Sequence, residues 1–153
     1  MEIDAYDKKI LTLLQKNNRM SQREMAEAVN LSASAVNRRI AALENAGIIA
    51  KNISIINPAK VGRPITIIVE VKIENERLDL FEEDKKRFIA CPQVQQVYYV
   101  TGDFDFLLVI NVSDMSEYEQ LTKELFFGSS NIKGFKTHVS MQNAKQTLDV
   151  LIR

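Results

Sequence analysis

Residues 21–47 constrain the fold of this chain more than any other stretch, because they predict two short helices joined by a tight turn. Ser21 is a favoured N-cap, and Glu24 three residues later completes a capping box. Asn30 is expected in the turn, and Ser32 is expected to cap the second helix. The stretch therefore has the outline of a helix-turn-helix.

A preceding helix completes this unit. Asp4 is expected to cap it, and Asp7 places a second acid in its first turn, where the helix dipole favours negative charge. Its apolar stripe can be hidden only against the two helices that follow, which predicts a three-helix unit over residues 3–47. Gly47 stands where a left-handed residue commonly ends a helix. The stripe consists of Ile10, Leu11 and Leu14.

The second helix of the pair has two distinct faces. Val36, Ile40 and Leu43 form an apolar stripe at helical spacing. The opposite face carries small, hydrogen-bonding or basic side chains, which suit a helix that enters the DNA major groove. The same pattern is typical of an ordinary solvated helix pair, so both interpretations remain open on this evidence. The face consists of Ser34, Asn37, Arg38, Ala41 and Asn45.

Charge is distributed unevenly along a chain whose formal net charge is zero. Residues 1–62 contain nine Lys/Arg and six Asp/Glu, a net charge of +3, whereas residues 63–153 contain eleven and fourteen, a net charge of −3. A basic first part joined to an acidic remainder supports a nucleic-acid-binding module attached to another module. The 46% hydrophobic content is sufficient for a buried core.

Cysteine content and hydropathy exclude several classes of protein. Cys91 is the single cysteine, which excludes an intrachain disulfide and a multi-cysteine zinc site. We expect it to be a small buried apolar residue. No signal-peptide pattern is visible, and no apolar run approaches the roughly 18 residues of a membrane-spanning helix. The chain is therefore expected to be cytoplasmic.

A break near residue 60 divides the chain. Residues 48–56 are rich in β-branched residues and predict a strand, either a wing beside the helices or an arm that reaches another chain. The turn-forming residues of Asn57-Pro58 and 62–64 interrupt the pattern. We predict a DNA-binding domain over residues 1–50, a β linker over 51–63, and a second domain over 64–153.

The second domain alternates strands and helices. Its order, βαββαβ with one extra strand, is that of the α+β ferredoxin-like sandwich. In the first helix, Leu78, Phe81, Phe88 and Ile89 are expected to face inward, and Ser113 or Asp114 is expected to cap the second. The predicted elements are strand 65–73, helix 77–90, a hairpin of strands 94–100 and 104–112, a helix after 114, strand 133–141 and a short strand 147–152.

Apolar residues occur on both faces of the first strand, in Ile65, Ile67 and Val69 on one face and Ile68 on the other. Helices packed on one side of an antiparallel sheet leave its other face uncovered. This pattern predicts that the second face is buried against another subunit.

The local sequences and their order together resemble the Lrp/AsnC family of leucine-responsive and asparagine-responsive transcription factors. The stretches that carry the resemblance are IDAYDKKILTLLQKNNR, MSQREMAEAVNLSASAVNRRIAALENAGII, INPAKVG and VYYVTGDFDFLLVINVSDMSEYEQL. The most specific parts are Leu31-Ser32-x-Ser34-x-Val36-x-x-Arg39 and Gly102-Asp103-x-Asp105. Ala33 departs from the proline that the family commonly has at this first helical position, which removes only some pre-organisation.

The resemblance implies a winged-type helix-turn-helix domain, a β linker and a ferredoxin-like amino-acid-binding domain. Members dimerise through the sheet, and the dimers commonly assemble into octamers. They bind double-stranded DNA over several half-sites and respond to small molecules, usually amino acids, at the interface between dimers. The resemblance thus implies a transcriptional regulator, and we expect it to need no cofactor and no metal.

The predicted DNA-binding residues lie on both helices of the pair. Arg38 can donate two hydrogen bonds to guanine, and Asn37 can read adenine or contact phosphate. Arg39 lies nearer the core edge, where a salt bridge within the chain or a phosphate contact is expected. Exposed N–H groups at the start of the first helix suit a phosphate, although Arg23 there is equally consistent with simple solvation. The full set is Ser21, Gln22, Arg23, Ser34, Asn37, Arg38 and Arg39.

The predicted effector site is the turn Thr101-Gly102-Asp103-Phe104-Asp105. Glycine permits close approach of the backbone to a ligand carboxylate, and an aspartate can hold an α-ammonium group. The residues alone equally predict a plain hairpin turn, and the family resemblance favours the site. Thr137 or Ser140 of a neighbouring subunit is expected to complete the pocket, and only one of the two, because they point to opposite faces of a regular strand.

The apolar residues around the turn, Tyr99, Phe104 and Phe106, favour leucine or methionine as the effector. His138, the only histidine, is expected to be a partly exposed strand residue. Asp103 and Asp105 make a poor metal site without a companion histidine or cysteine. Some siroheme decarboxylases also resemble this family, but one histidine and no tryptophan equip the chain poorly for that chemistry. We therefore predict a protein that is not an enzyme; a DNA-organising protein without an effector remains an alternative.

Overall fold

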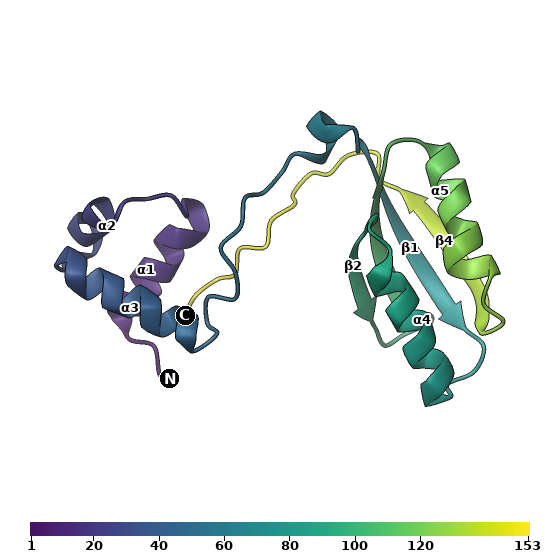
Figure 1. The fold of residues 1–153 in the computed structure, drawn as a ribbon, viewed down its shortest axis with the longest axis horizontal. Coiled ribbons are helices and arrows are strands. Elements are labelled where there is room, and N and C mark those ends of the chain that lie inside the picture. Colours follow the sequence, from purple (N-terminus) through teal and green to yellow (C-terminus); the bar gives the residue numbers. More distant parts are fainter. The chain divides into compact units, whose positions relative to one another are not determined.

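The computed structural model describes residues 1–153, which form two compact units. A helical unit contains residues 1–55 together with 146–153, and a sheet unit contains residues 56–145 (Figure 1). Each unit has its own cluster of buried apolar side chains. No helix in the structure has the length and apolar character needed to cross a membrane.

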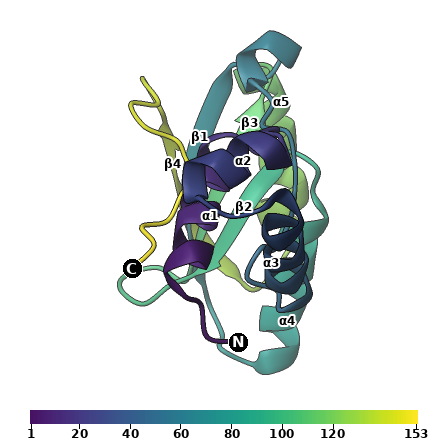
Figure 2. The same cartoon turned by 90° about the vertical axis from the view of Figure 1, so that its left-hand side faces the viewer.

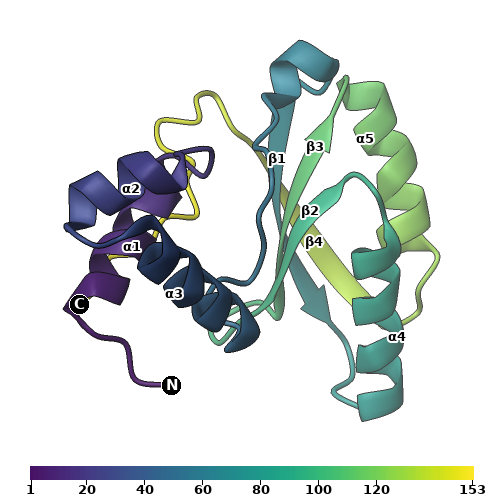
Figure 3. The same ribbon diagram turned by 60° about the vertical axis from the view of Figure 1, so that its left-hand side comes forward.

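The helical unit contains α1 (Ala5–Lys16), α2 (Gln22–Val29) and α3 (Ala33–Asn45), packed together as Figures 2 and 3 show. The Asp4 side chain accepts hydrogen bonds from the backbone N–H groups of Tyr6 and Asp7, both at 2.9 Å. The Asp7 side chain accepts from the Asp4 N–H at 3.0 Å, which completes a capping box. The predicted start of the first helix is confirmed.

The turn between α2 and α3 is also as predicted. The Ser21 hydroxyl accepts from the Glu24 N–H at 3.1 Å, and the Ser32 hydroxyl accepts from the Ala35 N–H at 3.2 Å. Asn30 adopts the left-handed conformation with φ 60°, which asparagine tolerates better than most residues. The helix-turn-helix prediction is confirmed.

Gly47 ends α3 at φ 72°. The Ile48 N–H donates to the Leu43 carbonyl and the Gly47 N–H donates to the Glu44 carbonyl, both at 2.9 Å, which is the Schellman arrangement. The core of the unit joins the apolar stripes of the three helices, as the helical spacing predicts. Its buried members are Ile10, Leu11, Met25, Ala26, Val29, Val36 and Leu43.

The strand predicted over residues 48–56 is not formed in this chain. Residues 50–57 have no regular secondary structure, and a short 3₁₀ helix follows at Pro58–Val61. A strand exists only when a second strand supplies its hydrogen-bond partners, and none is present beside this segment. The side chains of Ile53 and Ile55 remain 57% and 79% exposed.

The sheet unit has the ferredoxin-like order βαββαβ, and the predicted α+β class is confirmed. The elements are β1 (Ile65–Ile73), α4 (Leu78–Ala90), β2 (Val94–Tyr99), β3 (Phe106–Val112), α5 (Met115–Thr122), a single π-helical turn (Lys123–Phe127) and β4 (Ile132–Val139). The four strands are ordered β2-β3-β1-β4 with every neighbouring pair antiparallel. Helices α4 and α5 lie on the same face of the sheet (Figures 1 and 3).

Two inward positions predicted for α4 are wrong. Leu78 is 72% exposed and Ile89 is 62% exposed, whereas Phe88 is fully buried. The inward position on this face is taken by Asp84, which is 1% exposed and satisfied by three side chains. Because a charged residue faces the core, the apolar pattern alone misplaced the buried stripe.

Arg63 fixes the start of the sheet unit to α5. Its guanidinium donates to the Glu117 carboxylate, which also accepts from the Ser113 N–H at 2.7 Å and from Gln93 at 3.1 Å. The Ser113 N–H and then Arg63 lower the pKa of Glu117 to about 2. Asp114 is the cap of α5, since its side chain accepts from the Glu117 N–H at 2.8 Å.

The last eight residues do not form the predicted strand over 147–152. They are irregular and belong to the helical unit, although the boundary inferred from sequence placed them with the sheet. The Gln15 carboxamide donates to the Val150 carbonyl at 3.0 Å and accepts from the Val150 N–H at 2.8 Å. Ile152 packs against the helical core. A side chain, rather than a strand, therefore satisfies the backbone of Val150.

The sheet buries one face under its helices and leaves the other without a covering element. Ile67, Val69 and Val71 of β1 are fully buried on the helical side. The alternate positions of the strands carry a mixture of apolar and charged side chains on the open face. These include Ile68, Glu70, Tyr98, Leu107, Val109 and His138, among which a ring nitrogen of His138 is hydrogen-bonded to the Glu70 carboxylate.

Candidate functional site

The outer face of α3 is exposed at every position predicted for it, from Ser34 to Asn45. Arg38 makes no ion pair within the chain, so its guanidinium is available to a ligand. The Ser34 hydroxyl lies 3.2 Å from the hydroxyl of Ser32, the residue that caps the helix. The face thus presents one free cation among small polar groups, which is the chemistry required for contacts with base edges.

Gln22 connects the start of α2 to this face. Its amide nitrogen donates to the side-chain oxygen of Asn37, in the middle of α3. The structure therefore brings together residues that were predicted separately for the two helices. Phosphate contacts from α2 and base contacts from α3 can form on one surface.

Arg23 pairs with Glu27 at 3.6 Å, but the two side chains are 89% and 71% exposed. Exposed pairs of this kind contribute little to stability, so Arg23 can leave Glu27 for a phosphate without a large cost. The Ser21 hydroxyl is engaged as a cap, which leaves exposed backbone N–H groups as the donors of this helix start.

Arg39 forms the intramolecular salt bridge that the sequence left as one of two alternatives. Its guanidinium donates to Asp4 at 2.7 Å and to Asp7 at 2.9 Å, and lies 5.3 Å from the centre of the Tyr6 ring. The Asp7 N–H and then Arg39 lower the pKa of Asp4. The side chain of Asp7 is only 4% exposed. Arg39 therefore joins the middle of α3 to the capping box of α1.

The candidate effector turn is held firmly at the end of β1. Asp105 donates its N–H to the Val71 carbonyl at 2.9 Å, and one of its carboxylate oxygens accepts from the Ile73 N–H at 2.8 Å. Gly102 has φ 115°, a conformation that strains any residue with a side chain. Thr101, Gly102 and Asp103 are exposed. The second oxygen of Asp105 remains available to a ligand.

Thr137 and Ser140 do not lie beside this turn in the same chain. Thr137 pairs with Val69, and its hydroxyl is hydrogen-bonded to Tyr118 on the helical side of the sheet. Ser140 donates its N–H to Thr66 at 2.9 Å, seven residues along β1 from Ile73, or about 23 Å at the rise of a strand. Any joint role with the turn requires a second copy of the chain.

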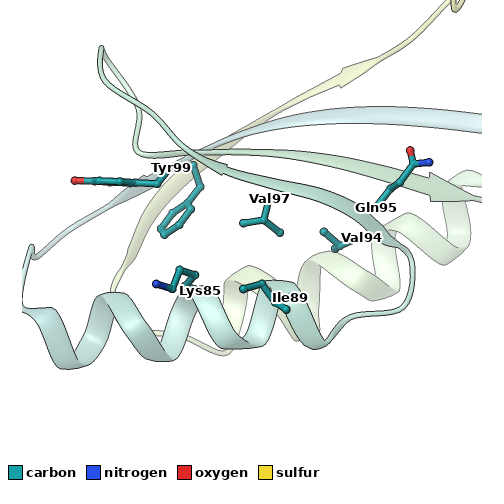
Figure 4. Close-up of a pocket in the computed structure, with 7 residues that line it drawn as sticks. Lys85, Ile89, Val94, Gln95, Val97 and Tyr99 are labelled. Carbon is teal, nitrogen blue, oxygen red and sulfur yellow. The ribbon is translucent and has the colours of Figure 1, made fainter. Parts of the chain in front are cut away.

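A cavity of about 260 Å³ lies between α4 and β2, close to the turn (Figure 4). Tyr99 and Phe106, which flank the turn, contribute to its walls. The sequence analysis does not identify the contribution of α4, because it assigns no role to Lys85 and expects Ile89 to face the core. The lining residues are Lys85, Ile89, Val94, Gln95, Val97, Tyr99 and Phe106. No three His, Cys, Asp or Glu side chains are placed to hold a metal ion.

Comparison with known families matches both units. Residues 3–50 match the model described as winged helix-turn-helix DNA-binding, and residues 66–150 match the model described as Lrp/AsnC ligand binding domain. An HTH-type transcriptional regulator of Sinorhizobium fredii is 43% identical over 99% of this chain and 90% of its own length. The leucine-responsive regulatory protein of Haemophilus influenzae is 34% identical over 95% of this chain and 87% of its own length.

Solved structures agree with these matches. An AsnC family transcriptional regulator of Agrobacterium tumefaciens has a TM-score of 0.92 at 26% identity and covers 97% of both chains. A transcriptional regulator of Neisseria meningitidis, solved as its complex with L-methionine, has a TM-score of 0.93 at 26% identity and covers 98% of this chain and 97% of its own. The matches to both units, in this order and over nearly the full length, show that the chain belongs to the Lrp/AsnC family of transcriptional regulators.

Proposed function

We propose that this protein is a sequence-specific DNA-binding regulator whose assembly or DNA affinity is set by a small effector, an amino acid. The observation that carries the DNA half is the exposed face of α3, where Arg38 is unpaired and Asn37 meets Gln22 of α2. Residues 1–50 would bind DNA, 51–63 would form the linker, and 64 onward would bind the effector. The protein would act in the cytoplasm.

The effector half rests on the turn at residues 101–105. The backbone at Gly102, which has no side chain to block approach, can bind the carboxylate of an amino acid. The free carboxylate oxygen of Asp105 can bind its ammonium group. The aromatic rings of Tyr99 and Phe106 beside the turn suit a medium apolar side chain. Leucine and methionine are the favoured ligands, and the methionine complex of the Neisseria regulator supports this choice.

Asp105→Asn separates this proposal from a plain hairpin turn. The amide oxygen can still accept from the Ile73 N–H, so the fold should persist, but the charge that would hold an ammonium group is lost. In a thermal-shift screen against the twenty amino acids, the wild type should be stabilised by leucine or methionine and the variant by none.

Glu119→Ala is the matched control, because Glu119 is an exposed carboxylate on α5. This variant should be stabilised by the same amino acids as the wild type. An equal shift for Asp105→Asn and wild type would show that the turn is not the site. If no amino acid shifts the wild type while DNA binding persists, the protein is a DNA-organising protein without an effector.

The open face of the sheet is the proposed contact between two copies. Ile68, Leu107 and Val109 lie on it, and no helix of the sheet unit covers them. Pairing would bring two helix-turn-helix units onto one duplex and raise affinity through effective concentration. Dimers would then assemble further, to an octamer in the family's common form.

Sedimentation of the purified protein should show an even-numbered oligomer at micromolar concentration. Leu107→Glu, which places a charge in the middle of the open face, should shift the distribution towards the monomer, because an unpaired buried charge disfavours association. A monomeric wild type would contradict the proposed pairing of the sheets.

A further inference from the structure

The last eight residues, 146–153, form a strap on the helical unit. Gln15 of α1 holds Val150 by both its backbone N–H and its carbonyl, at 2.8 and 3.0 Å. Ile152 packs against the core formed by the three helices. One side-chain amide thus replaces the neighbouring strand that an extended segment ordinarily requires.

The strap changes how the two units are connected. The chain passes from the helical unit to the sheet unit after Ile55 and returns after Lys145. With the strap bound, the helical unit is attached at two points rather than one. A single irregular linker would let the helical unit adopt many orientations relative to the sheet unit. A second attachment removes many of these orientations.

The attachment is weak enough to be released. Leu148, Val150 and Leu151 are 67–79% exposed, so the segment makes few apolar contacts other than those of Ile152. Segments with few buried contacts open at low free-energy cost. The strap can therefore differ between states of the protein while the three-helix core stays intact.

From this arrangement we propose that Gln15, through the C-terminal strap, is a positioning residue that sets the half-site spacing accepted by the protein. This inference rests on the proposed DNA-binding function. A paired helix-turn-helix protein reads two half-sites whose separation mirrors the separation of its recognition helices. A helical unit attached at two points accepts one separation, and a unit attached at one point accepts several.

The test uses the full-length protein and duplexes selected from random DNA by the wild type. Each selected duplex is compared with versions in which five base pairs are inserted between the half-sites, and with a single half-site. The variants are Gln15→Ala and a chain ended after Lys145. Gln120→Ala is the matched control, because Gln120 is an exposed glutamine on α5.

The wild type and Gln120→Ala should lose about 100-fold in affinity on the spaced duplex, within the range by which linked sites exceed single ones. Both strap variants should bind the two duplexes within about threefold of each other, with unchanged affinity for the single half-site. Hydrogen exchange at the Val150 amide should be faster in Gln15→Ala.

Three results would overturn the inference. The first is that the strap variants keep the wild-type preference for one spacing. The second is that Gln15→Ala also weakens binding to the single half-site, which would assign Gln15 to the stability of α1. Absence of binding by the wild type to any duplex would refute the proposed function itself, and the inference with it.

Discussion

Replacing Asp84 by alanine is expected to destabilise the sheet unit by about 3–5 kcal/mol, the cost of removing one partner of a buried charged network. Asp84 is 1% exposed and accepts from Arg87 at 2.7 Å, from Ser129 at 2.9 Å and from Asn131 at 3.1 Å. Asn131 in turn accepts from the N–H of Asn75 at 3.0 Å. One carboxylate therefore fixes the loops at the ends of β1 and α5, and its loss leaves several donors without an acceptor.

Urea unfolding followed by circular dichroism measures this effect. Glu83→Ala, one residue away and exposed on the same helix, should change the free energy of unfolding by less than about 0.5 kcal/mol. Asp84→Asn should fall between the two, because an amide retains one acceptor. A midpoint for Asp84→Ala equal to that of Glu83→Ala would show that the network does not stabilise the loops.

Phe106→Ala should cost about 3–5 kcal/mol, the usual range for truncating a buried aromatic side chain. Phe106 is fully buried, and its ring centre lies 5.1 Å from that of Phe81 and 5.3 Å from that of Phe88. It is also the first residue of β3, immediately after the candidate effector turn. The substitution should therefore abolish the stabilisation by amino acids as well as lower stability.

Both effects can be read from one thermal-shift series. Phe127→Ala is the control, because Phe127 is 71% exposed and should change stability little. Phe106→Leu keeps much of the apolar volume and should lose less than Phe106→Ala. If Phe106→Ala and Phe127→Ala have the same melting temperature, the structure's indication that the aromatic cluster supports the turn is contradicted.

Local signals in the sequence predicted most of the fold correctly. The caps at Asp4, Ser21 and Ser32 and the glycine at position 47 determine hydrogen bonds within a few residues, so they can be read without knowledge of the tertiary structure. The βαββαβ order follows from alternating periodicity in the same way. These features depend only on neighbours along the chain.

The errors occur where a distant residue decides the outcome. In place of the strand predicted over 147–152 there is an irregular segment, and the backbone of its Val150 is bonded by Gln15, 135 residues away. The stripe on α4 was misplaced because Ser129 and Asn131 let Asp84 face the core. Neither partner can be recognised from spacing along the chain.

The candidate site shows the same division. Helical periodicity correctly placed Asn37 and Arg38 on the exposed face, but the contact of Asn37 with Gln22 depends on how α2 packs against α3. The salt bridge of Arg39 could be named only as one alternative, since Asp4 and Asp7 lie on another helix. The proposed roles of Thr137 and Ser140 depend on a second chain.

The most direct measurement of the central proposal compares wild type and Arg38→Ala in binding to a selected duplex and to an unrelated duplex of equal length. Arg19→Ala, at an exposed arginine beyond the end of α1, is the control. If α3 reads bases through Arg38, the variant should lose about 5–150-fold on the selected duplex, or about 1–3 kcal/mol, and far less on the unrelated one. Equal losses on both would make Arg38 a phosphate contact, and unchanged binding to the selected duplex would contradict recognition by this face of α3.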